Sequence, residues 1–373
     1  MTLKIIHIIN DEKFLDAAYT AFEAAYPNKN EFIVFANSKE LKHLKLIKPK
    51  FLPTYYLYSA YLIQKSIQAD IVIFHSLHEG NLRILNALPK TIKTIWLGWG
   101  YDYYDLINAP LLKEKTLKYQ QSLSDRHPIK LKSIIKNIIV PKVYKRKLIN
   151  KIDIFSPVLY EDYLLVKQSI NNFTLKYVSW NYGTLEDDLI RGFEGKSVNG
   201  NNILLGNSAS LTNNHLDALE LLKTINLGPR KVVAPLSYGD LAYKNYIIGQ
   251  SKATLGSAFT PLIDFMPIDD YIEILQSCSI VIMNHLRQQA LGNIVIALYL
   301  GAKVFLNKEN PIYQFFINLD AVIYDIESLG SEMDSKLTQP QIDKNRQILQ
   351  EYWGREVILD KTTNIIKKAL SSH

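Results

Sequence analysis

Short apolar runs alternate with longer amphipathic stretches along most of the chain. The apolar runs have the length of buried β-strands, and the stretches between them repeat hydrophobic residues at helical spacing. Strands and helices that alternate in this way form βαβ units with parallel sheets, so the pattern predicts an α/β fold. The expected strands are 4–9, 31–36, 70–75, 92–96, 153–157, 202–206, 231–235, 262–265, 280–284 and 303–306. The expected helices of the second half are 213–224, 240–250, 269–277, 289–299, 311–316, 339–352 and 360–370.

A polar break at Gly195–Asn202 interrupts this alternation, which then starts again. We therefore expect an N-terminal domain over 1–198, a C-terminal domain over 199–338, and closing helices over 339–373 that could pack back on the N-terminal domain. Ligands of open parallel sheets usually bind at the carboxyl ends of the strands. The loops that follow the expected strands are therefore the first places to look for a site.

Composition narrows the class of protein. A hydrophobic fraction of 47% in 373 residues allows a sizeable core, and 21% charged residues give no sign of disorder. The net charge of +7 favours a polyanionic partner, which could be nucleic acid, an anionic membrane face or a phosphorylated substrate. The single cysteine, Cys278, excludes a disulfide within the chain and a cysteine-based zinc site. No apolar run is long enough for a transmembrane helix, so any membrane contact must be peripheral.

One segment, Lys130–Lys151, contains eight Lys or Arg residues and no acidic residue. Its isoleucine pairs recur near helical spacing, which is typical of a basic amphipathic stretch that lies on an anionic membrane. The alternative is a solvated linker helix, kinked at Pro141, whose apolar face packs on its own domain.

The most informative loop is His285–Asn293, where an apolar strand leads into a cluster of polar donors and then an apolar helix. Polar groups at a buried helix start need partners, and a diphosphate supplies charge and acceptors at the positive helix end. An arginine would pair with the diphosphate through its planar guanidinium group. Solvated surface side chains are the alternative. The candidate diphosphate-binding residues of this loop are His285, Arg287, Gln288, Gln289, Gly292 and Asn293.

Three other loops of the second half could add to this site. Small hydroxyl and amide residues follow one strand and could approach a phosphate, although ordinary helix capping explains them equally well. Two further loops offer rings or backbone groups to a flat base, with ordinary turns as the alternative. The candidates are Gly206, Asn207 and Ser208, then Pro235, Ser237 and Tyr238, and finally Phe265 and Met266.

Catalytic candidates come from two loops of the first half. Asp102 and Glu79 could serve as general bases, and His75 could orient a partner or share a proton. The alternatives are structural roles: Asp102 could be an ordinary turn residue, and His75 could be a core histidine whose ring nitrogens are hydrogen-bonded. Phosphate-loop, dinucleotide and zinc-protease motifs are absent, and so is the D-x-D pair that many metal-dependent sugar transferases use. We therefore expect no metal and no cofactor.

Taken together, the motifs of the second half resemble one family, the bacterial TDP-4-acetamido-4,6-dideoxygalactose (N-acetylfucosamine) transferases of enterobacterial common antigen synthesis. In the first half, Trp99–Tyr104 is similar to the family's W-G-x-D-L-Y, with Tyr103 in the leucine place. The motifs of the second half are Gly206-Asn207-Ser208 with Asn214-His215, Val233–Tyr238, Asp269-Asp270-Tyr271, Arg287–Gly292 and Asn310-Pro311.

The resemblance implies a GT-B fold, in which two Rossmann-like domains face each other across a cleft. It implies inverting, metal-independent transfer of a 6-deoxy-amino sugar from a dTDP donor to an undecaprenyl-diphosphate-linked saccharide. It places the enzyme peripherally on the cytoplasmic face of the bacterial inner membrane, with no nucleic-acid partner, and gives Lys130–Lys151 a role in contacting the membrane or the acceptor diphosphate.

Three other interpretations remain. A nucleotide-sugar epimerase would use the same fold and donor without a lipid acceptor. A non-catalytic basic module for membrane or nucleic acid would explain the charge but not the polar cluster at Arg287–Asn293. A dehydrogenase is disfavoured because the glycine fingerprint is missing.

Overall fold

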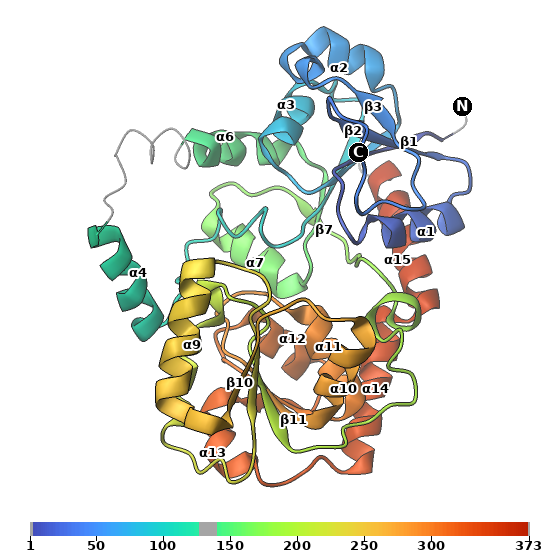
Figure 1. The fold of residues 1–373 in the computed structure, drawn as a ribbon. Helices are drawn as coiled ribbons and strands as arrows, with labels where there is room; N and C mark the ends of the chain where they lie inside the picture. The colour runs from blue at the N-terminus through green and yellow to red at the C-terminus, as the bar shows by residue number, and fades with distance from the viewer. Residues whose placement is uncertain (1–2, 127–139, 372–373) are drawn as a thin grey trace. The chain divides into compact units, whose positions relative to one another are not determined.

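The computed structural model describes residues 3–126 and 140–371, which divide into two compact units. Of these residues, the N-terminal unit comprises 3–108, 140–184 and 352–371, and the C-terminal unit comprises 109–126 and 185–351. Each unit has its own parallel sheet (Figure 1). The units are described separately below.

The sheet of the N-terminal unit has the order β3-β2-β1-β4-β5-β6-β7, and all neighbouring strands are parallel. Strands β1 and β4 are buried on both faces, because helices cover the sheet from each side. The strands are β1 (Ile5–Ile9), β2 (Asn30–Phe35), β3 (Lys50–Leu52), β4 (Ile71–His75), β5 (Lys93–Leu97), β6 (Ile154–Ser156) and β7 (Lys176–Tyr177).

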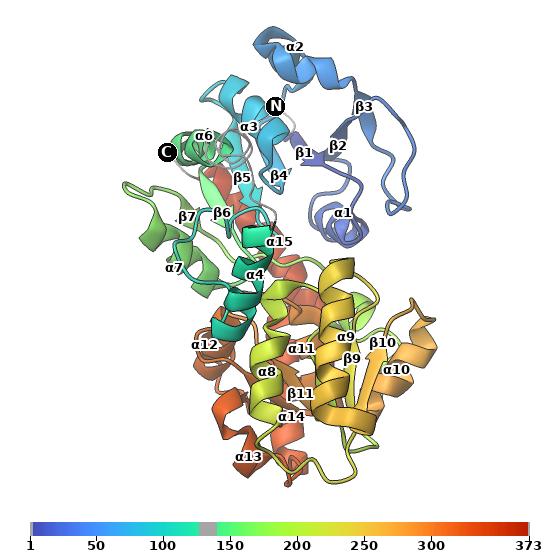
Figure 2. The ribbon, with the colours of Figure 1, turned by 60° about the vertical axis from the view of Figure 1, so that its left-hand side comes forward.

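Helices α1 (Leu15–Ala25) and α15 (Arg355–Leu370) lie together on one face of this sheet and share its core (Figures 1 and 2). The indole of Trp180 donates to Thr362 Oγ1 at 2.9 Å and holds α15 in place. The other helical elements are η1 (Thr54–Tyr58), α2 (Ala60–Ser66), α3 (Glu79–Ala87), α6 (Val140–Leu148), η3 (Ile149–Lys151) and α7 (Tyr160–Ser169).

The sheet of the C-terminal unit has the order β10-β9-β8-β11-β12-β13 and is also parallel throughout. Its strands are β8 (Asn202–Leu205), β9 (Val232–Pro235), β10 (Phe259–Leu262), β11 (Cys278–Met283), β12 (Lys303–Leu306) and β13 (Tyr324–Asp325). Its α-helices are α4 (Glu114–Arg126), α8 (His215–Leu222), α9 (Leu241–Leu255), α10 (Ile268–Ser277), α11 (Leu291–Leu300), α12 (Pro311–Asn318), α13 (Leu329–Glu332) and α14 (Gln339–Trp353). Single turns are η4 (Leu185–Leu189), η5 (Leu211–Asn213), η6 (Gly256–Ala258) and η7 (Ile326–Ser328).

Helix α4 joins the C-terminal unit although it comes from the middle of the first half of the chain. The carboxylate of Asp217 on α8 accepts from the backbone N–H groups of Lys115 and Thr116 and from the Thr116 hydroxyl, at 2.7 to 3.1 Å. These bonds satisfy the open N–H groups at the start of α4 from a neighbouring helix.

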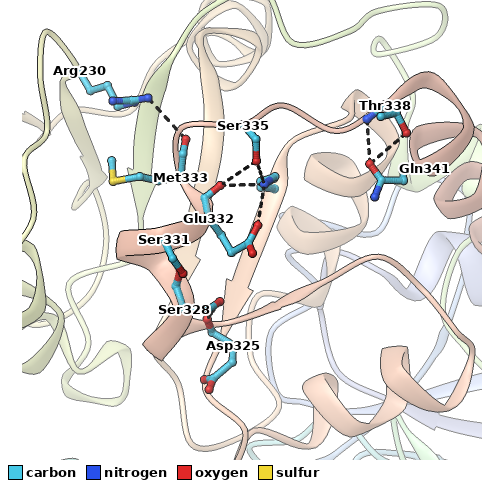
Figure 3. A network of polar contacts seen from close by, with 10 residues as sticks. Arg230, Asp325, Ser328, Ser331, Glu332, Met333, Ser335, Thr338 and Gln341 are labelled. Atoms are coloured by element: carbon cyan, nitrogen blue, oxygen red, sulfur yellow. Dashed lines mark hydrogen bonds and ion pairs between the residues drawn. The ribbon is translucent and has the colours of Figure 1, made fainter.

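The amino edge of the C-terminal sheet is held by a buried lysine. Lys303 at the start of β12 donates from Nζ to the carbonyl and carboxylate of Glu332 and to Ser335 Oγ, at 2.6 to 3.2 Å; Figure 3 shows these contacts. A lysine buried among hydrogen-bond acceptors on three sides is stable where an unpaired charge would not be. These contacts stabilise the amino edge of the sheet. The opposite, carboxyl edge is where ligands of open parallel sheets usually bind.

The structure confirms the α/β fold with two parallel sheets and shows differences in detail. The strand expected at 262–265 is wrong, because β10 ends at Leu262 and the residues after it form a loop. The expected domain boundary at 198/199 differs from the observed division at 184/185, because the Gly195–Asn202 break lies within the C-terminal unit. Part of Lys130–Lys151, residues 130–139, lies outside the described residues. Among the described residues, no helix combines the length and apolarity that a membrane span requires.

Candidate functional site

The winding direction of the C-terminal sheet reverses between β8 and β11. From β8 the chain runs to β9 and β10 on one side, whereas β11 is followed by β12 and β13 on the other. Open parallel sheets bind ligands at such a switch point, outside the carboxyl ends of the strands. Two of the loops selected from the sequence, the one at Gly206–Ser208 and the one starting at His285, leave these two neighbouring strands.

Asn213 joins the two loops. Its Nδ2 donates to the hydroxyls of Ser208 at 3.1 Å and Ser210 at 3.0 Å and to the Ser210 carbonyl at 3.3 Å. Because a carbonyl only accepts, this assigns the amide orientation, and Oδ1 is left to accept. It accepts from the Asn207 backbone N–H at 2.9 Å and from His285 Nε2 at 2.8 Å. One buried side chain therefore sets the shape of the β8 loop and ties it to the end of β11.

Two further side chains add to this connection. Asn214 donates from Nδ2 to the Asn284 carbonyl at 3.0 Å, and Asn284 returns a bond from its own Nδ2 to the Asn214 carbonyl at 3.2 Å. Gln289 donates to Asn207 Oδ1 at 3.0 Å and accepts from Thr212 Oγ1 at 2.6 Å. The polar residues predicted from the sequence therefore form a hydrogen-bond network between the two loops. In this network the side-chain amides of Asn207 and Gln289 are joined by a hydrogen bond.

Gly206 is required by the close approach of this network. Its φ of +68° lies in the left-handed region, and a Cβ at this position would lie 2.7 Å from Asn213 Oδ1 and 2.8 Å from His215 Nε2. Both of those side chains are buried and cannot move aside freely. A larger residue would therefore displace the network as well as strain the backbone.

The two histidines of the site are neutral. Burial lowers the pKa of His285 to about 3 and that of His215 to about 4. The bond to Asn213 Oδ1 means that the neutral His285 ring carries its proton on Nε2, so Nδ1 is an acceptor. Nδ1 of His285 and Nε2 of His215 are buried atoms without a hydrogen-bond partner among the described residues. These groups bring no positive charge to the site, which leaves Arg287 as the cation among the candidates selected from the sequence.

The remaining candidates line the same edge. Tyr238 is 60% exposed and accepts at its hydroxyl from Asn207 Nδ2 at 2.9 Å. Phe265 is 91% exposed, in the loop that follows β10. Arg287 is partly buried and Gln288 is buried. The other candidates are Pro235 at the end of β9, Ser237 after it, Met266 beside Phe265, and Gly292 and Asn293 in the first turn of α11.

In the N-terminal unit, Asp102 holds two loops together. Its Oδ2 accepts from Trp96 Nε1 at 2.7 Å and from the Leu77 backbone at 2.9 Å, while Oδ1 accepts from the Trp99 backbone at 2.7 Å. Burial raises the pKa of Asp102, and the nearby Lys145 opposes that shift. A raised pKa suits a general base, but the carboxylate is buried and occupied by three donors. The catalytic role of Asp102 stays a prediction. Its three hydrogen bonds also give it a structural role, because they join the loop after β4 to the loop after β5.

His75 belongs to a chain of hydrogen bonds whose direction follows from one amide. Asn30 donates from Nδ2 to the Tyr26 carbonyl at 2.8 Å, so its Oδ1 accepts from His7 Nε2 at 3.1 Å. His7 Nδ1 then accepts from His75 Nε2 at 2.9 Å, and His75 Nδ1 accepts from the Tyr182 hydroxyl at 2.8 Å. Burial lowers the pKa of both imidazoles, which keeps them neutral. His75 thus orients the Tyr182 hydroxyl.

The third catalytic candidate, Glu79, is on the surface. It lies in the first turn of α3, is 60% exposed, and pairs with Arg83 four residues later at 2.9 Å. The structure does not bring it into contact with Asp102 or His75. Within residues 3–126 and 140–371 there is also no group of three His, Cys, Asp or Glu side chains that could hold a metal ion.

The candidate list from the sequence left out three residues that hold the loops of the site from within, namely Ser210, Thr212 and Asn213. They stand in a run of polar residues that is typical of helix capping. The partners that join Thr212 and Asn213 to the other loop lie 77 and 72 positions later in the chain. The only signal was the density of short polar side chains between Asn207 and Asn214.

This part of the chain matches a known protein family. Residues 187–349 match the model of a family described as 4-alpha-L-fucosyltransferase, glycosyl transferase group 56. The matched segment contains β8 to β13 and all the loops of the site. The chain is a glycosyltransferase.

Solved structures of low sequence identity share the whole fold. A glycosyltransferase from Rickettsia africae superposes with a TM-score of 0.60 at 13% identity, covering 100% of both chains. Anabaena HepE, solved with UDP and glucose, gives a TM-score of 0.59 at 12% identity over 100% of both chains. Sucrose-phosphate synthase from Thermosynechococcus elongatus gives 0.62 at 8% identity, again over 100% of both chains. At these identities the similarity shows the fold, and that fold is GT-B.

Proposed function

We propose that this glycosyltransferase moves a 6-deoxy-amino sugar from a dTDP donor to an undecaprenyl-diphosphate-linked saccharide on the cytoplasmic face of a bacterial inner membrane. The observation that carries the donor half of this proposal is the network of Asn213, Asn214 and Gln289. It fixes two loops at the switch point of the C-terminal sheet, within the segment that matches the transferase family. The acceptor half rests on the resemblance of the sequence motifs.

In this proposal the leaving diphosphate lies against the first turn of α11. The N–H groups of Leu291, Gly292 and Asn293 there have no partner within the helix, and the helix dipole favours an anion. Arg287 supplies the positive charge, and Gly206 allows the β8 loop to approach a phosphate. Tyr238, Phe265 and Met266 border the nucleoside. Stabilisation of the leaving group by such fixed donors needs no metal.

The chemical step is a direct displacement that inverts the anomeric centre. A base takes the proton of the acceptor hydroxyl, whose oxygen forms a bond to the anomeric carbon. The bond from that carbon to the phosphate oxygen breaks, and the nucleoside diphosphate leaves with the electron pair. Asp102 remains our first candidate for the base, and His75 acts through Tyr182 as a positioning residue.

Nucleotide binding tests the donor half. Thermal-shift titrations of the full chain with dTDP, UDP, GDP and CMP should show the largest stabilisation with dTDP, because ligand binding to the folded state raises its stability. No shift with any of the four nucleotides would contradict the whole proposal. A preference for UDP would retain the transferase and change the donor.

A matched pair of variants locates the nucleotide. Arg287→Ala should weaken nucleotide binding and turnover together, because it removes the cation at the diphosphate. Arg230→Ala is the control, since Arg230 pairs with Asp334 and donates to the Met333 carbonyl at the opposite edge of the same sheet.

Incubation of the donor with and without a lipid-linked acceptor then separates transfer from epimerisation. An epimer formed without acceptor would favour an epimerase.

A further inference from the structure

Three tyrosines stand out on the surface of the N-terminal unit. Tyr55, Tyr58 and Tyr61 are 61%, 75% and 68% exposed, and they follow one another on η1 and α2. Large rings exposed to this degree next to each other are uncommon on a protein surface without a partner. None of them belongs to the donor site or to the network around His75 and Asp102.

Cations accompany these rings. The guanidinium of Arg83 on α3 lies 4.6 Å from the Tyr58 ring centre, and Lys65 Nζ lies 5.8 Å from that of Tyr61. We call the surface formed by Tyr55, Tyr58, Tyr61, Lys65 and Arg83 the tyrosine face. Rings that alternate with long basic side chains present apolar area and positive charge together.

The surroundings of the tyrosine face are basic. The segment from Thr54 to Ala69 contains no acidic residue, and neither does the segment from Val140 to Ile152. Helix α6 in the second segment packs beside α3, which in turn packs beside α2 and η1 (Figures 1 and 2). It adds the exposed Val143, 48% accessible, and the exposed Lys147. Arg83 also pairs with Glu79 at 2.9 Å, so this pair adds no net charge and the net positive charge comes from Lys65 and Lys147.

We propose that the tyrosine face docks on the surface of an anionic phospholipid bilayer. Tyrosine rings are favoured at the level of the lipid headgroups, where the ring is in an apolar layer and the hydroxyl reaches water. Lysine and arginine beside them meet the negative headgroups. The proposal rests on the proposed function, because a lipid-linked acceptor is presented at a bilayer. The rings and cations of the tyrosine face lie outside the basic segment Lys130–Lys151, and helix α6 of that segment borders the face.

Vesicle binding by the full chain tests this surface. The chain should sediment with vesicles of phosphatidylglycerol and phosphatidylcholine in equal parts, and much less with phosphatidylcholine alone. The triple variant Tyr55→Ser, Tyr58→Ser, Tyr61→Ser should bind the anionic vesicles at least about tenfold more weakly, because it removes the apolar contact. Removing a positive charge, as in Lys65→Gln, should weaken binding to the anionic vesicles about fivefold.

Matched controls use exposed apolar and basic residues elsewhere. Leu359→Ser with Leu370→Ser removes two exposed leucines from α15, on the other face of the same sheet, and should leave vesicle binding unchanged. Lys252→Gln on α9 is the control for charge. The dTDP thermal shift of each variant shows that it is folded and that the donor site is intact.

Each alternative outcome contradicts the inference in a recognisable way. If the triple variant binds vesicles like the wild type but loses transfer to a soluble saccharide acceptor, the rings bind sugar. If the face binds an oligonucleotide and no vesicles, its partner is a nucleic acid. If the wild type ignores vesicles but still transfers sugar from dTDP, the docking surface is wrong and the proposed function stands.

Discussion

Replacing Asn213 by alanine would test whether the donor site depends on the network between its two loops. The side chain is 1% exposed, and its removal leaves two buried donors, the Asn207 N–H and His285 Nε2–H, without their acceptor. A buried donor that loses its partner costs about 1–3 kcal/mol. Since a water molecule could enter the space of the lost amide, we expect a total loss of about 2–4 kcal/mol.

Such a loss of stability is measurable as a fall in the melting temperature. For a unit of this size, 1 kcal/mol corresponds to roughly 2–4 °C, so the melting temperature of the C-terminal unit should fall by about 4–16 °C. The stabilisation by dTDP should shrink as well, because the β8 loop loses its fixed shape. Asn226→Ala is the control, since Asn226 is an exposed loop residue of the same unit that accepts one bond, from Gly228.

Asn213→Asp separates stability from binding. The aspartate keeps an acceptor for Asn207 and His285, and the hydroxyls of Ser208 and Ser210 can turn to donate to it. It also places a buried negative charge beside the two loops that would hold the donor diphosphate in our proposal. We expect a smaller loss of stability than in the alanine variant and a larger loss of nucleotide binding. A variant that binds dTDP like the wild type would refute the placement of the diphosphate, and an unchanged melting temperature in Asn213→Ala would refute the structural reasoning.

Three other predictions follow from the same contacts. Gly206→Ala should abolish the dTDP thermal shift, because its Cβ would meet Asn213 Oδ1 at 2.7 Å; a normal nucleotide response would contradict the close approach. Asp102→Asn should lower both kcat and the melting temperature, because its amide cannot accept all three bonds; a fall in kcat alone would favour the role of base, and full activity would exclude it. Acid should destabilise the fold between about pH 6.5 and pH 4, since His285, with a pKa of about 3, and His215, with a pKa of about 4, stay neutral while the unfolded chain binds protons. Each such histidine removes up to about 1.4 kcal/mol per pH unit below pH 6.5, so urea midpoints that stay constant from pH 7 to pH 5 would contradict this.

The sequence predicted most strands of the fold because a central parallel strand is buried on both faces and is therefore a continuous apolar run. β1 and β4 are such strands, and their expected bounds agree with the observed ones within a residue. Edge strands lack this pattern. β3, β7 and β13 have two or three residues each and were not predicted, and β10 was placed too late because Thr260 and Pro261 break its apolar run.

The site was predictable as a set of loops but not as a network. Polar density after an apolar strand marked His285 and Gln289, and the polar residues after β8 marked Asn207. Which of them would meet depends on β8 and β11 being neighbours in the sheet, although β9 and β10 come between them in the chain. No local pattern carries that information, and Asn213 therefore looked like a capping residue.

This difference changes how the polar cluster acts. From the sequence, His285 and Gln289 were expected to contact the donor directly, whereas in the structure their bonds go to Asn213, Asn207 and Thr212. A donor site gains more from groups that are already fixed than from groups that must reorient during the reaction. In our proposal these side chains hold the loops, so that backbone N–H groups and Arg287 meet the diphosphate without further ordering. On this argument, loss of Asn213 should reduce turnover as much as loss of a residue that touches the donor.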